Sequence, residues 1–573
     1  MAKSHIAEQL EQVRQEARTA VAEDAAESTV ALNPVIGVNR NQIFRAVGST
    51  AFQMLKQPTI FAKHTAKLTA ELVDIVAGNS GIAPDKKDRR YADPAFSGNP
   101  VYKIWMQSHL AWQEAVLNWV ADTDLSENGV KRAQFILNML ADATAPTNSL
   151  LGNPAAARRI LDTGGRSLIN GVINFLDDVE NNGGMPAQVD KSKFDVGENL
   201  ACSEGAVVFR NDFLELIQYS PRTSEVYSTP IMVLPPQINK FYFMDLTPEK
   251  SMIQHMTGLG HQIFMVSWRN PTEAMRHWGL DEYISALKEA IIAVQNVSKS
   301  EKINLMGPCS GGITASILTA HLDALGNSPI NSVTLLVCVL SQQLAENDLG
   351  MFTNAAALER VRAKSKKKGI LSGKELASTF SWMRPNDLVW NYVANNYLMG
   401  NKPPAFDVLY WNNDSTNLPA QLHSDFIDLM ANDPLSQEGA MSVCDTPLNL
   451  KAVDVDLFQV GGMTDHITPW TSCYKSGLLY GKGKAEFVMC NSGHIQSLVA
   501  APGNPKSRYF TNTQLPQTSA EWLEGAKENS GSWWDHWDKW LSTRSGKKKT
   551  APKSLGNRKY KNLAAAPGSY VYE

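Results

Sequence analysis

Residues 302–318 read KINLMGPCSGGITASIL: a short apolar run, the turn Gly307-Pro308-Cys309-Ser310-Gly311, and a helical pattern. A strand, a sharp turn and a helix in this order form the G-x-S-x-G nucleophile elbow, here with cysteine in place of serine. Gly307 and Gly311 suit the turn, because a Cβ at either position would crowd the neighbouring backbone. The positive end of the following helix favours a thiolate, so we predict that Cys309 is a nucleophile.

Short apolar runs recur on both sides of this stretch, and helical patterns separate several of them. The runs are PIMVLPP (230–236), HQIFMVSW (261–268), SVTLLVCVL (332–340), DLFQVGG (456–462) and AEFVMCNSG (485–493). This alternation predicts an α/β protein with a mainly parallel sheet that helices cover on both faces. We expect an antiparallel hairpin before these runs, at Asn211-Asp212, between two β-like segments.

Polar residues with catalytic chemistry follow the last two runs. Asp465 and His466 come after DLFQVGG, and His494 comes after AEFVMC. The chain order nucleophile, acid, histidine is that of the α/β-hydrolase fold, where these loops converge above the sheet. We predict this fold, with His494 as the general base toward Cys309 and Asp465 as its orienting acid. His466 is the weaker candidate base, because a neighbour of the acid cannot easily be oriented by it and also reach the nucleophile.

An oxyanion hole in this fold takes one backbone N–H from the residue after the nucleophile and one from the loop after an earlier strand. Ser310 supplies the first. In the loop after PIMV, Pro235 and Pro236 have no N–H, so Ile238 is the expected second donor. The alternative is that the two prolines only stiffen the end of a strand.

The domain organisation is predicted from a change in the spacing of apolar residues along the chain. Apolar spacing is helical from about residue 40 to 180, and the stretch NNGGMPAQVD (181–190) ends it. We predict a helical N-terminal domain over 1–200 and a catalytic α/β domain over 201–573. Within the latter, residues 341–445 lose the alternation and are expected to form a cap inserted over the C-terminal edge of the sheet.

Two terminal segments have unusual patterns. Residues 5–27 carry a narrow apolar stripe made of Ile6, Leu10, Val13, Ala17 and Val21. The stripe fits a helix that docks on a partner or a lipid-like surface, and equally a loosely held surface helix. The segment 544–561 is basic without a single acid, and we expect it to be a solvated, flexible tail.

Composition excludes several classes of protein. The 573 residues carry 54 basic and 57 acidic side chains, a net charge of −3, which argues against a nucleic-acid-binding protein. Six cysteines without a C-x-x-C pair fit a reducing cytoplasm. The chain has no signal-peptide pattern and no apolar run long enough for a transmembrane segment. The histidines show no metal-ligand spacing, so no metal site is predicted.

A cysteine nucleophile indicates the type of reaction. An acyl group that moves from a thioester donor to Cys309 remains a thioester, and therefore stays activated for transfer to an alcohol. On a serine it would become an ester instead. The site thus suits acyl transfer from an acyl-CoA at least as well as hydrolysis.

Motifs along nearly the whole chain resemble those of the polyhydroxyalkanoate (PHA) synthases. They include NPVIGV (33–38), PTNSLLGNPAA (146–156), PPQINKFY (235–242), WMRPNDLVWNY (382–392), PPAFDVLYWNND (403–414), DHITPW (465–470), NSGHIQS (491–497) and SWWDHW (532–537). Several of them, above all the N-terminal ones, look more like the medium-chain-length (class II) branch.

The resemblance implies a cytoplasmic bacterial enzyme that polymerises (R)-3-hydroxyacyl-CoA into polyester and releases CoA. It implies a homodimer at the surface of polyester granules, where granule-associated proteins could join it, and a preference for medium-chain acyl groups. No cofactor is implied, because coenzyme A is the leaving group. By motif, the family's nucleophile, aspartate and histidine fall on Cys309, Asp465 and His494.

The family's aspartate is also given a second task, the activation of the 3-hydroxyl of the incoming acyl group. We favour that task for Asp465, because a cysteine needs less help to ionise than an alcohol does. Two residues depart from the family pattern: Pro308 in the elbow and Ser341 at the end of a strand. They bear on the acyl pocket and on the attachment of the cap. The alternatives to a polymerase are a thioesterase or polyester hydrolase on the same fold, and a non-catalytic granule-associated protein.

Overall fold

The computed structural model describes residues 56–86, 88–341, 355–377 and 385–573. These residues divide into two compact units. The first holds the described residues up to Asp190 together with 385–406, and the second holds the remainder from Lys191 onward. The apolar stripe expected over residues 5–27 lies outside the described part of the chain.

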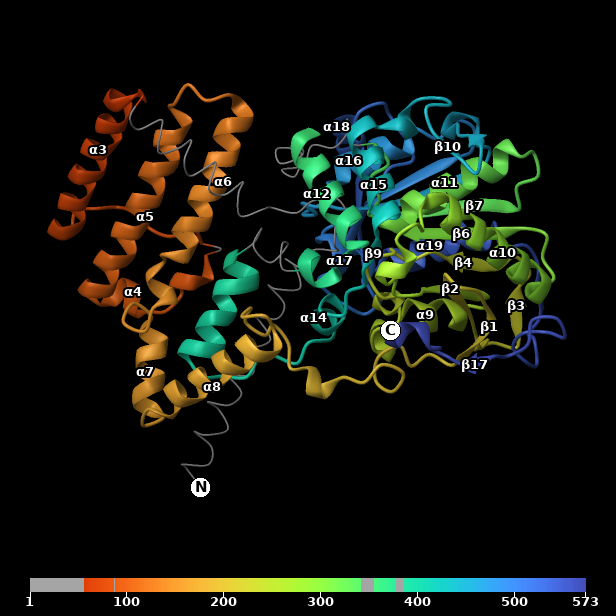
Figure 1. Cartoon of the computed structure of the whole chain (residues 1–573), viewed down its shortest axis with the longest axis horizontal. Coiled ribbons are helices and arrows are strands. Elements are labelled where there is room, and N and C mark those ends of the chain that lie inside the picture. The colour runs from red at the N-terminus through yellow and green to blue at the C-terminus, as the bar shows by residue number, and fades with distance from the viewer. Residues whose placement is uncertain (1–55, 87, 342–354, 378–384) are drawn as a thin grey trace. The chain divides into compact units, whose positions relative to one another are not determined.

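The first unit is helical, as predicted (Figure 1). Its helices are α3 (Pro58–Ala77), α4 (Ala95–Gly98), α5 (Pro100–Ala121), α6 (Glu127–Ala143), α7 (Pro154–Asp162) and α8 (Arg166–Asn181). Proline begins α5 and α7, and the preceding Asn99 and Asn153 side chains accept hydrogen bonds from the backbone N–H groups of Val101 and Ala156. Polar caps and proline at the first position thus set where these helices start.

Residues 385–406 belong to this helical unit, although the sequence suggested that they are part of the cap. They form two short π-helical segments, η8 (Asn386–Trp390) and η9 (Val393–Leu398). The Asn174 side chain of α8 donates to the carbonyls of Asn396 and Asn401, each at 2.9 Å. Gly171 of α8 has no room for a Cβ against the carbonyl of Tyr397. The segment predicted as one cap, 341–445, is therefore divided between the units, and the first boundary lies at 190 rather than 200.

The described part of the second unit contains an eleven-stranded sheet in the order β15-β14-β13-β12-β7-β6-β4-β5-β2-β1-β17. The strands are β1 (Gly205–Arg210), β2 (Leu214–Tyr219), β4 (Ile231–Val233), β5 (Ile263–Trp268), β6 (Ile303–Pro308), β7 (Ile330–Leu336), β12 (Asp456–Gly462), β13 (Ala485–Cys490), β14 (Arg508–Thr511), β15 (Lys527–Ser530) and β17 (Ala564–Ala565). The strands from β5 to β13 are parallel, and β1 and β2 form the predicted antiparallel hairpin. This is the predicted α/β-hydrolase sheet.

Helices flank the sheet and complete the core (Figure 1). They include α9 (Met252–Gly258), α10 (Leu280–Ser298), α11 (Ser310–Ala324), α16 (Trp470–Gly477), α17 (His494–Leu498), α18 (Ser519–Glu524) and α19 (Trp533–Ser542). Between β7 and β12 lie α12 (Ala355–Lys368), α14 (Asp407–Asn412), α15 (Ala420–Asn432) and the small pairs β8 (Ile370–Leu371) with β9 (Leu418–Pro419) and β10 (Ser442–Val443) with β11 (Thr446–Pro447). The central strands β5, β6 and β7 are apolar and almost entirely buried, which is typical of a parallel sheet covered on both faces.

The basic C-terminal segment is not the flexible tail that its composition suggested. Its strand β16 (Lys548–Thr550) pairs with β3 (Glu225–Tyr227), and the Lys549 ammonium donates to the Ser298 carbonyl at 2.5 Å. Farther on, the Tyr570 hydroxyl donates to the Asn211 carbonyl at 2.8 Å. Strand pairing forms hydrogen bonds between backbone groups, which do not depend on the charge of the side chains. Composition alone therefore could not reveal that this segment is ordered. Among the residues described, no helix combines the length and apolar character needed to cross a membrane.

Candidate functional site

The strand–turn–helix elbow predicted from the sequence is present in the structure. β6 ends at Pro308, α11 begins at Ser310, and Cys309 between them has φ 50° and ψ −125°. A positive φ is strained for a residue with a Cβ, and such strain is typical of functional turns. A Cβ on Gly307 would lie 2.6 Å from the Gly311 carbonyl oxygen, and one on Gly311 would collide with the Leu234 carbonyl. The two glycines are thus required for the turn that holds the Cys309 thiol at the helix start.

Asp465 and His494 lie together beyond the ends of two adjacent parallel strands, β12 and β13. Asp465 is in the loop after β12, and His494 is the first residue of α17. His494 Nδ1 lies 2.6 Å from Asp465 Oδ2, and neither side chain is exposed to solvent. The carboxylate of Asp465 thus pairs with His494, and the ranking of His494 ahead of His466 as the base stays a prediction.

The electrostatics of this pair favour the charged imidazole. Burial lowers the pKa of His494, but the charge of Asp465, its hydrogen bond and the interaction with the Cys309 thiol outweigh burial and raise it to about 10. Burial also opposes ionisation of Asp465, yet attraction to His494 and hydrogen bonds hold its pKa below the usual value. These interactions favour the imidazolium form of His494 at neutral pH. Its buried Nε2 has no hydrogen bond of normal geometry to any described atom.

Four donors saturate the Asp465 carboxylate. Oδ1 accepts from the backbone N–H groups of Ile467 and Thr468, each at 2.9 Å. Oδ2 accepts from the Thr468 hydroxyl at 2.7 Å and from His494. An ionised carboxylate offers about four acceptor positions, so none is left for a substrate hydroxyl. This geometry favours the orienting role of Asp465 over the activating role that we preferred from the sequence.

The expected oxyanion donors come from two segments that meet at the elbow. Ser310 is the first residue of α11, where a backbone N–H has no acceptor within the helix. Ile238 is buried in the loop after β4, and this loop is fixed to α11 because the Gln237 amide donates to the Thr314 hydroxyl at 2.8 Å. Both N–H groups remain predicted oxyanion donors.

Sequence reasoning missed Thr468, whose hydroxyl contacts both Asp465 and His494. The available signal was its place three residues after Asp465 in DHITPW, where a short polar side chain can turn back on the preceding residues. Sequence reasoning also missed that Cys473 lies near the pair, with its thiol donating to the Thr468 carbonyl at 3.4 Å.

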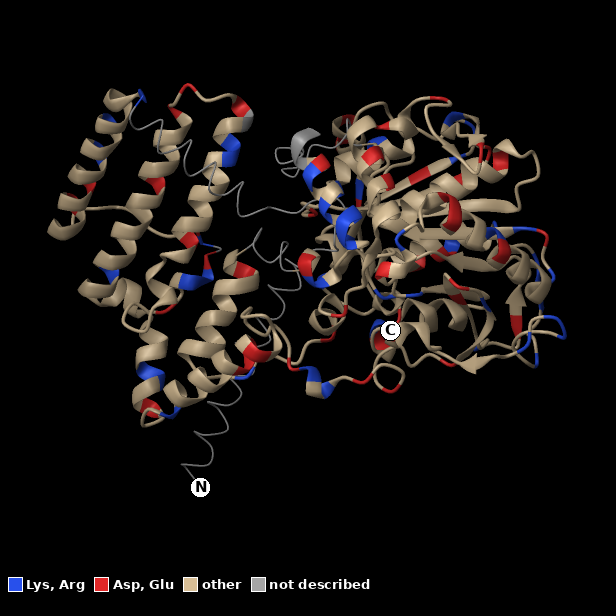
Figure 2. Ribbon diagram, in the orientation of Figure 1, with Lys and Arg blue, Asp and Glu red and all other residues tan. Residues whose placement is uncertain are grey.

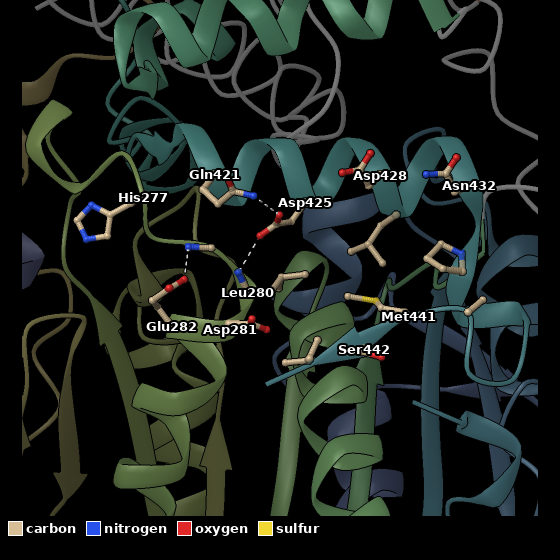
Figure 3. A pocket seen from close by; sticks show the side chains of 15 residues that line it. His277, Leu280, Asp281, Glu282, Gln421, Asp425, Asp428, Asn432, Met441 and Ser442 are labelled. Carbon is tan, nitrogen blue, oxygen red and sulfur yellow. Dashed lines mark hydrogen bonds between the residues drawn. The ribbon is translucent and has the colours of Figure 1, made fainter. Parts of the chain in front are cut away.

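A pocket of about 570 Å³ opens elsewhere in the second unit, between the start of α10, α15 and the β10 hairpin (Figure 3). None of Cys309, Asp465 and His494 lines it. Its walls carry the carboxyl groups of Asp281, Glu282, Asp425 and Asp428. Like charges repel, so this pocket is unsuited to the phosphates of an acyl-CoA. Among the described residues, no group of three or more His, Cys, Asp or Glu side chains could hold a metal ion.

Two protein families and several individual proteins match this chain. The family described as "Poly-beta-hydroxybutyrate polymerase (PhaC) N-terminus" matches residues 87–256, and the "alpha/beta hydrolase fold" family matches residues 230–501. The chain is 48% identical over 549 residues to "Poly(3-hydroxyalkanoate) polymerase 1" of Ectopseudomonas oleovorans, covering 96% of this chain and 98% of that one. It is 44% identical to polymerase 2 of the same organism, over 94% and 96% of the two chains. It is 39% identical to "Poly(3-hydroxyalkanoate) polymerase subunit PhaC" of Cupriavidus necator, over 84% and 83%.

Proposed function

This chain belongs to the poly(3-hydroxyalkanoate) polymerases, and we propose that it builds its polyester from (R)-3-hydroxyacyl-CoA through a thioester on Cys309, with release of CoA. The observation that carries this proposal is the thiol on a strained elbow beside a buried His494–Asp465 pair. No cofactor takes part in the proposed chemistry, since CoA is only the leaving group.

In the first proposed step, Cys309 Sγ attacks the thioester carbonyl of the acyl-CoA as a thiolate. The bond between the carbonyl carbon and the CoA sulfur breaks, and the acyl group stays on Cys309. The CoA thiolate takes the Nε2 proton of the His494 imidazolium, so free CoA leaves and His494 becomes neutral. The backbone N–H groups of Ser310 and Ile238 stabilise the negative charge on the carbonyl oxygen during this step.

In the second proposed step, neutral His494 accepts the proton of a 3-hydroxyl group, and that oxygen attacks the acyl-Cys309 thioester. A carbon–oxygen ester bond forms and the carbon–sulfur bond breaks. Cys309 returns to its thiolate form, and His494 carries the proton again. One base thus serves both steps, which is consistent with the saturated carboxylate of Asp465.

One experiment separates this function from its alternatives. Purified protein is incubated with an (R)-3-hydroxyacyl-CoA, and both CoA release and product size are followed. Polymer together with CoA supports the proposal, whereas free hydroxy acid indicates a thioesterase or polyester hydrolase. Absence of CoA release would indicate a non-catalytic granule-associated protein.

We also propose that the enzyme is cytoplasmic and works at the surface of polyester granules as a homodimer. Support for the granule surface comes from an apolar face on α8, made of Ile169, Val172, Ile173, Leu176 and Val179. These side chains recur at helical spacing and are between 51% and 62% exposed. In Figure 2, α8 is uncharged along most of its length, with its acidic residues near its C-terminal end. An exposed apolar helix face of this kind suits an apolar polymer surface.

Charge placed on the apolar face of α8 is expected to weaken attachment to polyester. Ile173→Glu combined with Leu176→Glu should lower the fraction of enzyme that sediments with poly(3-hydroxyalkanoate) particles about tenfold, because two carboxylates must be desolvated. CoA release in solution should stay near the wild-type rate. Asn170→Glu, at an exposed polar position of the same helix, is the matched control. Equal sedimentation of all three proteins would exclude this face as the attachment surface.

Chain-length preference should follow the medium-chain branch that the motifs resemble. When medium-chain 3-hydroxyacyl-CoA and 3-hydroxybutyryl-CoA compete, we expect the polymer to contain mainly medium-chain units. Each additional methylene buried in an acyl pocket contributes about 1 kcal/mol, so several of them discriminate strongly. The monomer composition of the polymer, measured by chromatography, tests this preference. A strict preference for 3-hydroxybutyryl-CoA would contradict the prediction.

A further inference from the structure

Thr468 contacts both members of the buried acid–histidine pair. Its Oγ1 donates to Asp465 Oδ2 at 2.7 Å and lies 3.0 Å from His494 Nδ1. Its backbone N–H also donates to Asp465 Oδ1 at 2.9 Å. The residue is 8% exposed, so water does not readily replace these contacts. One side chain thus restricts the carboxylate and the imidazole together.

The positions of the protons follow from counting donors and acceptors. The Thr468 hydroxyl has one proton, and the hydrogen bond to Asp465 uses it. The ionised carboxylate has none to give. The short contact between His494 Nδ1 and Asp465 Oδ2 therefore needs the proton on Nδ1, with the Thr468 oxygen beside it as a second acceptor. This arrangement leaves Nε2 as the nitrogen that can exchange a proton with another group.

We propose that Thr468 is a positioning residue of the reaction: its hydroxyl keeps Asp465 ionised and keeps the Nδ1–H of His494 directed at Oδ2. Nε2 is then held in place to exchange protons with CoA and with the substrate hydroxyl. The inference rests on the proposed function, because it assumes that His494 is the base in both steps. It assigns to the hydroxyl a role in the chemistry and not only in the packing of the loop.

Several titratable groups surround Asp465. His494 approaches from α17 and Cys473 from α16, and His466 is the next residue in the loop. Cys309, just before α11, interacts with His494. Burial and the charge of Asp465 raise the pKa of the Cys473 thiol well above its usual value, so it stays neutral. The pKa of Asp465 is lowered although burial acts to raise it, because His494 and the two Thr468 hydrogen bonds stabilise the carboxylate. Loss of the hydroxyl should therefore raise the pKa of Asp465.

The test replaces the hydroxyl by a methyl group of similar size, Thr468→Val. The rate of the first CoA burst is measured by rapid quench as a function of pH. A hydrogen bond to a charged group is stronger than one between neutral groups, so we expect a burst slowed about tenfold at neutral pH. We also expect the acidic limb of the pH profile to move upward by about one pH unit. Thr468→Ser retains the hydroxyl and should restore both the burst rate and the wild-type position of the acidic limb.

Thermal unfolding of each variant shows whether the fold is intact. If the valine variant does not fold, Thr468→Ala is measured instead and should move the acidic limb in the same direction. A folded variant without the hydroxyl whose acidic limb coincides with that of wild type would overturn the inference, as would a serine variant that behaves like the valine one. Absence of a burst from the wild-type enzyme would instead reject the proposed function.

Discussion

Cys309→Ala is expected to reduce CoA release from 3-hydroxyacyl-CoA by more than about a thousandfold, to the background of the assay. The acyl group has no other acceptor in the proposed chemistry, because none of the other five cysteines, all of which lie in the described part of the chain, stands between a strand and a helix start in this way. Cys309 occupies the elbow, with a strained φ of 50° and the His494 imidazole beside it. Both single-turnover and steady-state CoA release should be lost together.

The matched control is Cys338→Ala. The Cys338 sulfur packs against Gly312 under the first turn of α11, and burial raises the pKa of this thiol far above its usual range. It is a neutral packing group, so its replacement should lower the unfolding temperature without removing the CoA burst. An active Cys309→Ala enzyme, or a Cys338→Ala enzyme that folds but releases no CoA, would refute the assignment of the nucleophile.

Asp465→Asn is expected to slow acylation of Cys309 and chain elongation in parallel, by as much as about 10⁴-fold. The amide has no charge, so the pKa of His494 falls from about 10 toward the low value that burial favours. The imidazole also loses the acceptor that directs Nδ1–H, and both proposed steps depend on Nε2. Rapid-quench measurement should show a reduced CoA burst together with a reduced turnover.

The test has a matched control and one outcome that would contradict the expectation. Asp454→Asn, at an exposed position before β12, should leave both rates unchanged. A full stoichiometric burst in Asp465→Asn without later turnover would instead mean that Asp465 activates the substrate hydroxyl. That outcome would require the carboxylate to exchange one of its four donors during the reaction.

The same pair should leave a signature in stability. The pKa of His494 is raised from 6.5 to about 10 in the folded protein, so the stabilisation from its proton is fully present below pH 6.5. This stabilisation is lost as the pH rises through about 10. In Asp465→Asn this dependence of the free energy of unfolding on alkaline pH should largely disappear.

Local patterns were enough to predict much of this protein. The elbow around Cys309, the order of Cys309, Asp465 and His494, the parallel sheet and the hairpin at Asn211-Asp212 all follow from spacing within short segments. The physical reason is that parallel strands end at the same edge of a sheet. The positions of the strands are therefore enough to predict that the residues just after them lie close together. The choice of His494 over His466 rests on a separate argument, that a neighbour of the acid cannot easily be oriented by it and also reach the nucleophile.

Tertiary structure decided what depends on contacts between distant segments. Residues 385–406 join the helical unit because the Asn174 amide and the small Gly171 fit their backbone, which no local pattern reveals. The basic C-terminal segment is ordered because its backbone completes strand pairs. Above all, the role of Asp465 depends on which donors occupy its oxygens. A sequence indicates that a carboxylate is present, whereas only the folded loop brings Ile467, Thr468 and His494 to its four acceptor positions.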